Sequence, residues 1–216
     1  MHIFTDTGCS VAWLNQAYKV REGQRTYHDF NNTAMGWGLP AAIGGALALG
    51  RPTLCLTGDG SLMMNVQEFA TIAHLNLPVK TIILDNRGYS MVRQTEEQWL
   101  DGVNVGTSVE SGLGFPDWPA LATSFGIPAD SVDRNDDLPD ALATFFSTEG
   151  PAVLHVAINH AHRVIPQVAF GYGIEDAEPH LPRDEFLAQM IVDPLERSLQ
   201  PTDPSRTLPP REERER

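Results

Sequence analysis

The chain has 216 residues, of which 42% are hydrophobic and 20% charged, a balance that predicts a folded globular domain. Acidic residues outnumber basic ones 28 to 15, for a formal charge of −13, which argues against a nucleic-acid partner. No apolar run approaches the ~20 residues of a membrane span, and the first residues lack the basic start of a signal peptide. With only two cysteines, Cys9 and Cys55, a disulfide scaffold is excluded and a cytoplasmic protein without a membrane partner is expected.

Strands and helices alternate over residues 1 to about 158. Short apolar runs predict buried strands at residues 3–5, 53–57, 79–84 and 152–158. Helical spacing predicts helices at residues 10–19, 41–49, 66–73 and 138–147. Asn65 is expected to cap the third of these helices. The alternation predicts an α/β fold, a doubly wound and mainly parallel sheet with helices on both faces and ligands at the carboxyl ends of the strands.

The pattern changes after Ile158. Residues 159–183 are rich in His, Pro and Gly, and the next dozen residues favour one more helix, at 184–195. We predict one domain over residues 1–195. Its C-terminal extension, 159–195, either folds over a cleft as a lid or packs elsewhere as a loop. The Pro-, Arg- and Glu-rich stretch 196–216 is expected to be a disordered tail.

Polar residues follow two of the predicted strands directly. Gly-Asp-Gly-Ser occupies 58–61, and Asp-Asn-Arg-Gly occupies 85–88. If the two strands are neighbours, the side-chain oxygens of Asp59 and Asn86 project into one crevice, and such hard ligands suit Mg²⁺. The glycine and serine after Asp59 leave the backbone open to phosphate oxygens. The blocks therefore predict a diphosphate bound through a metal, which supplies the positive charge that this acidic chain lacks.

Two simpler interpretations are weaker. Gly-Asp-Gly alone fits an ordinary turn, but the second polar block after another apolar strand favours a site. A phosphate-binding P-loop is absent, because no Gly-x-x-x-x-Gly-Lys-Ser/Thr occurs, and Gly36-Trp37-Gly38 lacks the third glycine of a dinucleotide fingerprint.

The two polar blocks resemble the thiamine diphosphate motif, in which Gly-Asp-Gly is followed after about two dozen residues by Asn-Asn or Asp-Asn. Two further blocks are similar to those of the acetolactate synthase-like branch: Met-Gly-Trp-Gly-Leu-Pro-Ala-Ala-Ile-Gly at 35–44 and Met-Val-Arg-Gln at 91–94. The resemblance covers residues 3 to about 195. It is closest to the C-terminal cofactor-diphosphate-binding (PP) domain, and it implies the thiamine diphosphate-binding fold with thiamine diphosphate and Mg²⁺ as cofactors.

The resemblance also assigns roles to individual residues. The metal ligands it implies are the side chains of Asp59 and Asn86 and the carbonyl of Gly88. Contacts with the cofactor's diphosphate are implied for Cys9, Ser10, Gly58, Gly60 and Ser61. The backbones of Thr33 and Met35 would hold the aminopyrimidine, with the Met35 side chain wedged under the bent cofactor unless it is ordinary core. The residues implied to face the reacting carbon are Met91 and Val92. Asp85 replaces the first Asn of the usual pair, which is not a ligand.

The implied activity needs a second domain. In this family a glutamate on a separate pyrimidine-binding (PYR) domain activates the cofactor, and no acidic residue here offers a credible substitute. We therefore expect half an active site, from a natural stand-alone subunit or a longer enzyme, that pairs with a PYR-domain subunit in an α2β2 heterotetramer. The implied reaction decarboxylates a 2-keto acid, expected to be pyruvate, and transfers the acyl unit to a carbonyl acceptor.

Thr95 departs from the acetolactate synthase pattern, which has a Trp after Arg-Gln that shapes the acceptor pocket. Its replacement implies a roomier pocket and a bulkier acceptor, such as a keto-sugar or another ketone. The alternatives are a simple 2-keto acid decarboxylase that releases aldehyde and a non-catalytic cofactor-binding partner.

Overall fold

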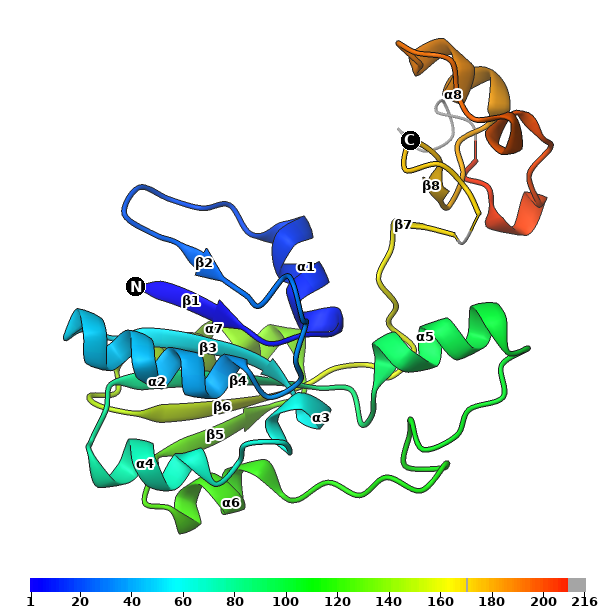
Figure 1. Cartoon of the computed structure of the whole chain (residues 1–216). Helices are drawn as coiled ribbons and strands as arrows, with labels where there is room; N and C mark the ends of the chain where they lie inside the picture. The colour runs from blue at the N-terminus through cyan, green and yellow to red at the C-terminus, as the bar shows by residue number, and fades with distance from the viewer. Residues whose placement is uncertain (170, 210–216) are drawn as a thin grey trace. The chain divides into compact units, whose positions relative to one another are not determined.

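The structure, a computed structural model, describes residues 1–169 and 171–209 and divides the chain into two compact units, 1–163 and 164–216 (Figure 1). The strands of the first unit are β1 (His2–Thr5), β2 (Thr26–Tyr27), β3 (Thr53–Gly58), β4 (Val79–Asp85), β5 (Ala129–Val132) and β6 (Ala152–Ala157). Its α-helices are α1 (Cys9–Ala17), α2 (Gly38–Leu49), α3 (Asp59–Leu62), α4 (Glu68–His74), α5 (Ser90–Trp99), α6 (Trp118–Ser124) and α7 (Leu138–Ser147). A short 3-10 helix, η1 (Asn135–Asp137), precedes α7. None of the described helices is long and apolar enough to span a membrane.

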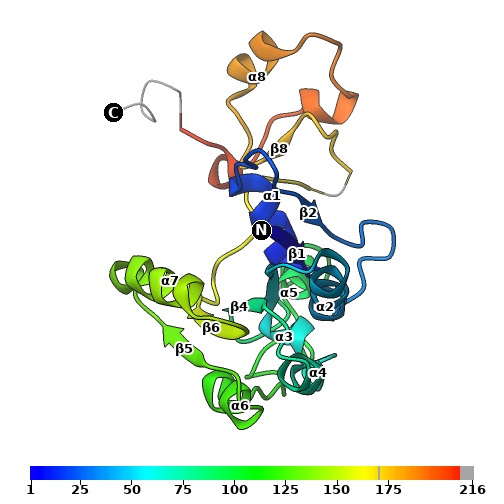
Figure 2. The ribbon, with the colours of Figure 1, turned by 90° about the vertical axis from the view of Figure 1, so that its left-hand side faces the viewer.

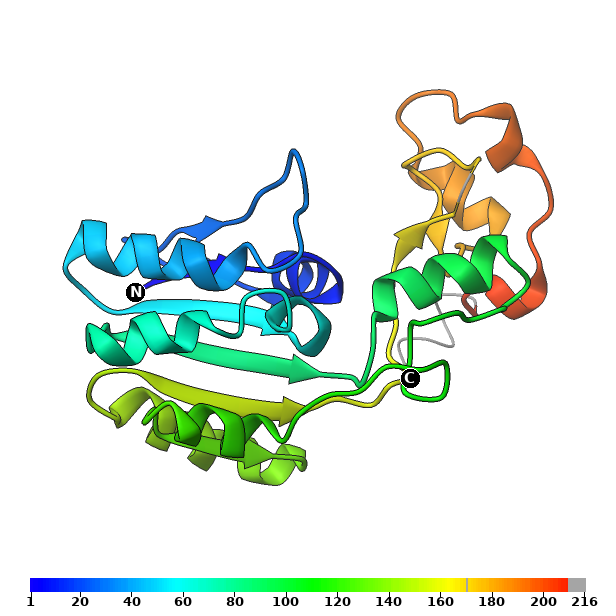
Figure 3. The same cartoon turned by 60° about the horizontal axis from the view of Figure 1, so that its bottom comes forward.

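The six strands form one parallel sheet in the order β2-β1-β3-β4-β6-β5. Their carboxyl ends therefore lie at one edge of the sheet, as Figure 3 shows for the long central strands. This arrangement confirms the predicted parallel sheet. The prediction succeeded because apolar runs such as 79–84 suit strands that are covered on both faces. Strands β2 and β5 were not predicted, since Thr-Tyr and Ala-Asp-Ser-Val contain no apolar run.

Helices cover both faces of the sheet, as predicted (Figure 2). On one face α2, α4 and α6 pack in a core that contains Leu39, Phe69 and Trp118, each at most 1% exposed. On the other face α1 and α7 contribute to a second core around Leu154 and Phe145. Burying each such side chain contributes about 1.5–3 kcal/mol. The two cores hold the sheet rigid, and its carboxyl edge can position a site.

Several helix boundaries differ from the sequence-based ones. Helix α2 begins at Gly38 and ends, as its sequence predicts, before Gly50, whose left-handed conformation (φ 58°) closes the helix. Asn65 does not cap α4, because that helix begins at Glu68. The side-chain amide of Asn65 donates to the carbonyl of Gly36 instead. The prediction failed because a long-range hydrogen bond took the side chain that a local cap would have used.

The second unit contains the β7–β8 hairpin (Gln167–Val168 and Ala177–Glu178), helix α8 (Arg183–Gln189) and the 3-10 helices η2 (Glu196–Leu199) and η3 (Pro204–Arg206). Helix α8 is shorter than the predicted 184–195. The guanidinium of Arg183 donates to both carboxylate oxygens of Asp176, which is 1% exposed, and to the carbonyl of Ser198.

The structure describes residues 196–209 of the stretch predicted to be a disordered tail, and hydrogen bonds join them to other residues of the second unit. Besides the bond from Arg183, the backbone of His180 pairs with Arg206 and Leu208. Arg206 also forms an ion pair with Glu178 at 2.6 Å. The composition of a tail does not reveal such contacts with distant residues, and the disordered tail stays a prediction. The remaining part of the predicted tail, 210–216, lies outside the described residues, and a lid formed by 159–195 stays a prediction.

Candidate functional site

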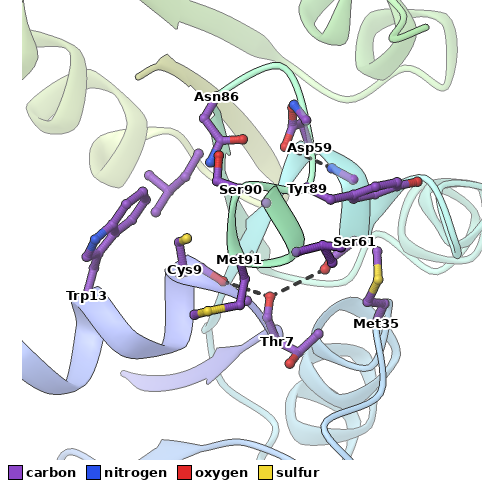
Figure 4. Close-up of a pocket in the computed structure, with 17 residues that line it drawn as sticks. Thr7, Cys9, Trp13, Met35, Asp59, Ser61, Asn86, Tyr89, Ser90 and Met91 are labelled. Atoms are coloured by element: carbon purple, nitrogen blue, oxygen red, sulfur yellow. Dashed lines mark hydrogen bonds between the residues drawn. The ribbon is translucent and has the colours of Figure 1, made fainter. Parts of the chain in front are cut away.

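A pocket opens at the carboxyl ends of β1, β3 and β4 (Figure 4). Strands β3 and β4 are neighbours, with Gly58 opposite Leu84, so the polar residues that follow them meet. The predicted residues that line the pocket are Cys9, Ser10, Met35, Gly58, Asp59, Gly60, Ser61, Asn86, Gly88, Met91 and Val92. Thr33 is exposed and is not among the described residues of the lining.

Asp59 ties the two polar blocks together. Its side chain is almost fully buried, and its two oxygens accept hydrogen bonds from the backbone N–H groups of Gly60 and Gly88, both at 2.9 Å. Burial, followed by the nearby carboxylate of Asp85, raises the pKa of Asp59 to about 8. The carboxyl group therefore carries a proton near neutral pH until a cation takes its place.

Asn86 presents an amide oxygen to the same pocket. Its Oδ1 atom is buried and has no hydrogen-bond partner among the described residues. A buried acceptor without a partner costs about 1–3 kcal/mol, so its retention calls for a ligand. Together with the carboxylate of Asp59 it offers hard oxygen donors, which fit Mg²⁺. Clusters of three or more His, Cys, Asp or Glu, as zinc sites use, are absent from the described part of the chain.

Asp85 lies beside these groups and is held by other contacts. Its Oδ2 is 2.9 Å from Nε2 of His155, whose Nδ1 is 2.8 Å from the hydroxyl of Ser131, and its Oδ1 accepts from the backbone of Arg87. Burial alone would raise the pKa of Asp85, but hydrogen bonds from His155 and Asp59 outweigh it and hold that pKa below its usual range. Asp85 thus anchors the 85–88 loop.

Close packing fixes the loop at Gly88. Its Cα faces the backbone of Thr107 and Ser108, and the next residue, Tyr89, donates to the carbonyl of Thr107. The ring of Tyr89 in turn lies against Gly60, so that a methyl group at Gly60 would overlap it. The two glycines therefore allow the polar blocks and the 107–108 segment to approach one another.

We expect Gly88→Ala to weaken Mg²⁺-dependent binding of thiamine diphosphate by at least about tenfold, comparable to the loss of an outer-shell metal contact. The added methyl would overlap the backbone oxygen of Thr107, which cannot rotate away, and the loop carrying Asn86 must shift. Calorimetric titration measures the affinity. Gly114→Ala is the matched control, because a methyl there has open space. Equal affinities in both variants would show that the loop position is unimportant.

The first loop closes the opposite side of the pocket. The hydroxyl of Ser10 donates to the carbonyl of Thr7 at 3.3 Å, and the hydroxyl of Ser61 donates to the same carbonyl at 3.4 Å, as Figure 4 shows for Ser61. Cys9 is 6% exposed, and burial raises the pKa of its thiol to about 11, so it stays protonated at neutral pH. The loop therefore offers neutral hydroxyl and backbone groups.

Two methionines, Met35 and Met91, also line the pocket. Met35 is 37% exposed and stands between two left-handed residues, Thr33 (φ 49°) and Gly36 (φ 84°). Met91 and Val92 belong to the first turn of α5. The half-exposed Met35 does not fit the alternative of ordinary core packing.

Sequence reasoning missed several lining residues, namely Thr7, Gly8, Trp13, Leu84, Tyr89 and Ser90. Tyr89 and Ser90 lie in the sequence between Asp-Asn-Arg-Gly at 85–88 and Met-Val-Arg-Gln at 91–94. Their position between two predicted parts of the site could have indicated that they line it. Trp13 follows Cys9 by four residues on α1 and therefore shares its helix face.

A parallel α/β sheet with an oxygen-donor crevice at its carboxyl edge is typical of proteins that bind a phosphorylated cofactor. Residues 6–156 match the model of a protein family described as "Thiamine pyrophosphate enzyme, C-terminal TPP binding domain". The chain belongs to this family, whose cofactor is thiamine diphosphate under its other name.

Curated relatives are acetolactate synthases. The chain is 37% identical to acetolactate synthase 2, chloroplastic, of Brassica napus over 183 residues, which cover 81% of this chain and 28% of the relative. It is 35% identical to the acetolactate synthase isozyme 2 large subunit of Escherichia coli (strain K12) over 170 residues, which cover 78% of this chain and 30% of that relative. The match thus spans less than a third of each of these relatives, and the chain is an acetolactate synthase-like domain.

Proposed function

We propose that this chain binds the diphosphate of thiamine diphosphate through Mg²⁺ in an enzyme that decarboxylates a 2-keto acid, with pyruvate as the expected donor. The acyl unit then passes to a carbonyl acceptor. The observation that carries the proposal is the buried, unpartnered Oδ1 of Asn86 beside the carboxyl group of Asp59. These oxygens fit a metal, and the hydroxyls and backbone of the pocket fit a diphosphate.

The roles of the residues follow from their positions. Asp59, Asn86 and the carbonyl of Gly88 would hold the metal, and Ser10 and Ser61 would exchange their bonds to Thr7 for phosphate oxygens. When bound, thiamine diphosphate supplies the electron sink for decarboxylation. Met35 and the start of α5 would exclude water from the reacting end and orient the substrates there.

Activation of the cofactor is assigned to a PYR domain. Asp59, which lines the pocket, is engaged with backbone N–H groups, and Asp85 beside it is engaged with His155. We propose a PYR-domain subunit as the partner, with an α2β2 heterotetramer as the assembly.

The acceptor is proposed to be bulkier than pyruvate. Thr95 lies on α5 one turn after Met91, and its hydroxyl donates to the carbonyl of Met91 at 3.0 Å. A small, internally bonded side chain leaves more room than the Trp of acetolactate synthases. A simple decarboxylase that releases aldehyde is the second candidate, because both reactions use the same site residues.

Assays of the purified chain and of its complex with a co-purified partner test the proposal. The chain alone should bind thiamine diphosphate with Mg²⁺ and turn over no pyruvate. The complex should release CO₂ and form a carboligation product, whereas stoichiometric aldehyde would favour the simple decarboxylase. Failure of both preparations to bind the cofactor would reject the function, and turnover by the chain alone would reject the need for a partner.

A further inference from the structure

Asp6 is a fully buried carboxylate directly after β1, and no cation pairs with it within the described part of the chain. It is satisfied by hydrogen bonds instead. Oδ1 accepts from the backbone of Thr7 and Gly36, both at 2.9 Å, and Oδ2 accepts from the backbone of Gly38 at 3.1 Å and the hydroxyl of Thr57 at 3.3 Å. Burying a carboxylate is expensive, so only a precise set of donors retains it.

Two hydrogen bonds to the backbone of Gly36 hold the loop that carries Met35. The N–H of Gly36 donates to Asp6, and the carbonyl of Gly36 accepts from the side chain of Asn65. Gly36 is left-handed (φ 84°), and a methyl group there would lie 2.7 Å from both Asn65 and Met64. The residue after Met35 is therefore clamped from two sides.

The same carboxylate also holds the opposite loop of the pocket. It accepts from the N–H of Thr7, whose carbonyl receives the hydroxyls of Ser10 and Ser61. The backbone carbonyl of Asp6 accepts a second, shorter bond from Ser10, at 2.9 Å. One side chain thus spans the gap between the proposed diphosphate contacts and Met35.

We propose that Asp6 is a positioning residue that sets the distance between the diphosphate end of the pocket and Met35. This inference rests on the proposed function, which places Met35 at the reacting end of the cofactor, away from the diphosphate. The competing explanation is that Asp6 only caps helix α2. Its side chain accepts a hydrogen bond from the first N–H of that helix, at Gly38, and the helix's own N-cap residue makes no side-chain bond.

The two explanations differ for ligands of different size. In Asp6→Asn the side chain keeps its shape, but one oxygen becomes an amide nitrogen that must face backbone N–H donors, either those of Thr7 and Gly36 or that of Gly38. If Asp6 positions Met35, Mg²⁺-dependent affinity for thiamine diphosphate falls about tenfold, as expected for a hydrogen bond to a charged group. Affinity for inorganic diphosphate with Mg²⁺ falls clearly less, because that ligand depends on the Thr7 loop but does not reach Met35. A cap alone changes the melting temperature without this selectivity.

Two variants sharpen the comparison. Thr57→Val removes one bond to Oδ2 without touching Gly36, and it should leave both affinities unchanged. Met35→Ala should reproduce the selective loss. Adding Asp6→Asn to Met35→Ala should then cause no further loss, since residues that act through one another are not additive.

Methyl NMR of methionine-labelled protein gives a readout that needs no cofactor. The Met35 signal should shift in Asp6→Asn and stay in place in Thr57→Val. Asp6→Ala removes every bond to the side chain, so an unmoved Met35 signal in Asp6→Ala, or equal loss of both ligands in Asp6→Asn, would overturn the positioning role. If the unaltered protein binds neither ligand, the proposed function fails, and the Met35 signal still decides whether Asp6 controls this loop.

Discussion

Asp59→Ala should abolish Mg²⁺-dependent binding of thiamine diphosphate, with an affinity loss of about 100-fold or more. Loss of an outer-shell metal contact already costs about 10–100-fold, and Asp59 is predicted to contact the metal directly. The alanine also frees the N–H groups of Gly60 and Gly88, so the two polar blocks lose their connection. Isothermal titration with and without Mg²⁺ measures the effect.

Glu22→Ala controls for the removal of one negative charge, because Glu22 is exposed and outside the pocket lining. Asp59→Asn keeps the side-chain shape and one oxygen ligand, but it removes the charge and turns an NH₂ group toward the N–H of Gly60 or Gly88, so an intermediate loss is expected. Circular dichroism must show that each variant is folded. Wild-type affinity in folded Asp59→Ala would eliminate the metal assignment.

The second large effect is a pH dependence of metal binding. Burial and Asp85 raise the pKa of Asp59 from its ordinary 3.8 to about 8, so Mg²⁺ must displace a proton at neutral pH. Affinity should therefore rise with pH, by up to about tenfold per unit below pH 8, and level off above it. Calorimetry in buffers of different ionisation enthalpy should detect about one proton released at pH 6.5 and almost none at pH 9.

The metal-free protein should show the opposite trend in stability. The protonated form of Asp59 is favoured in the folded chain, so its contribution is complete below the unfolded pKa of about 4 and is lost as pH rises through about 8. The melting temperature should decline over this range and decline less with saturating Mg²⁺. A pH-independent affinity together with no proton release would show that Asp59 is already ionised in the free protein.

Much of the candidate site was predictable because its residues sit at fixed points of a repeated local pattern. Each buried strand is an apolar run, and the residue after the run necessarily reaches the carboxyl edge of a parallel sheet. Asp59 and Asn86 could thus be placed in one crevice, and the register between β3 and β4 confirms this placement. The position of Thr33 could not be derived in the same way, because its loop has no periodic pattern, and its contact with the cofactor stays a prediction.

The sequence by itself determined the parallel α/β fold, the family and the residues at the two strand ends, since strand periodicity and short motifs are local. Only the tertiary structure decided which groups those residues meet. Asp6 reaches Gly36 thirty residues away, Asn65 joins the same loop instead of capping a helix, and Gly88 packs on Thr107. Contacts of this kind leave no periodic trace in the chain, because close packing and hydrogen-bond satisfaction are settled between segments after they fold together.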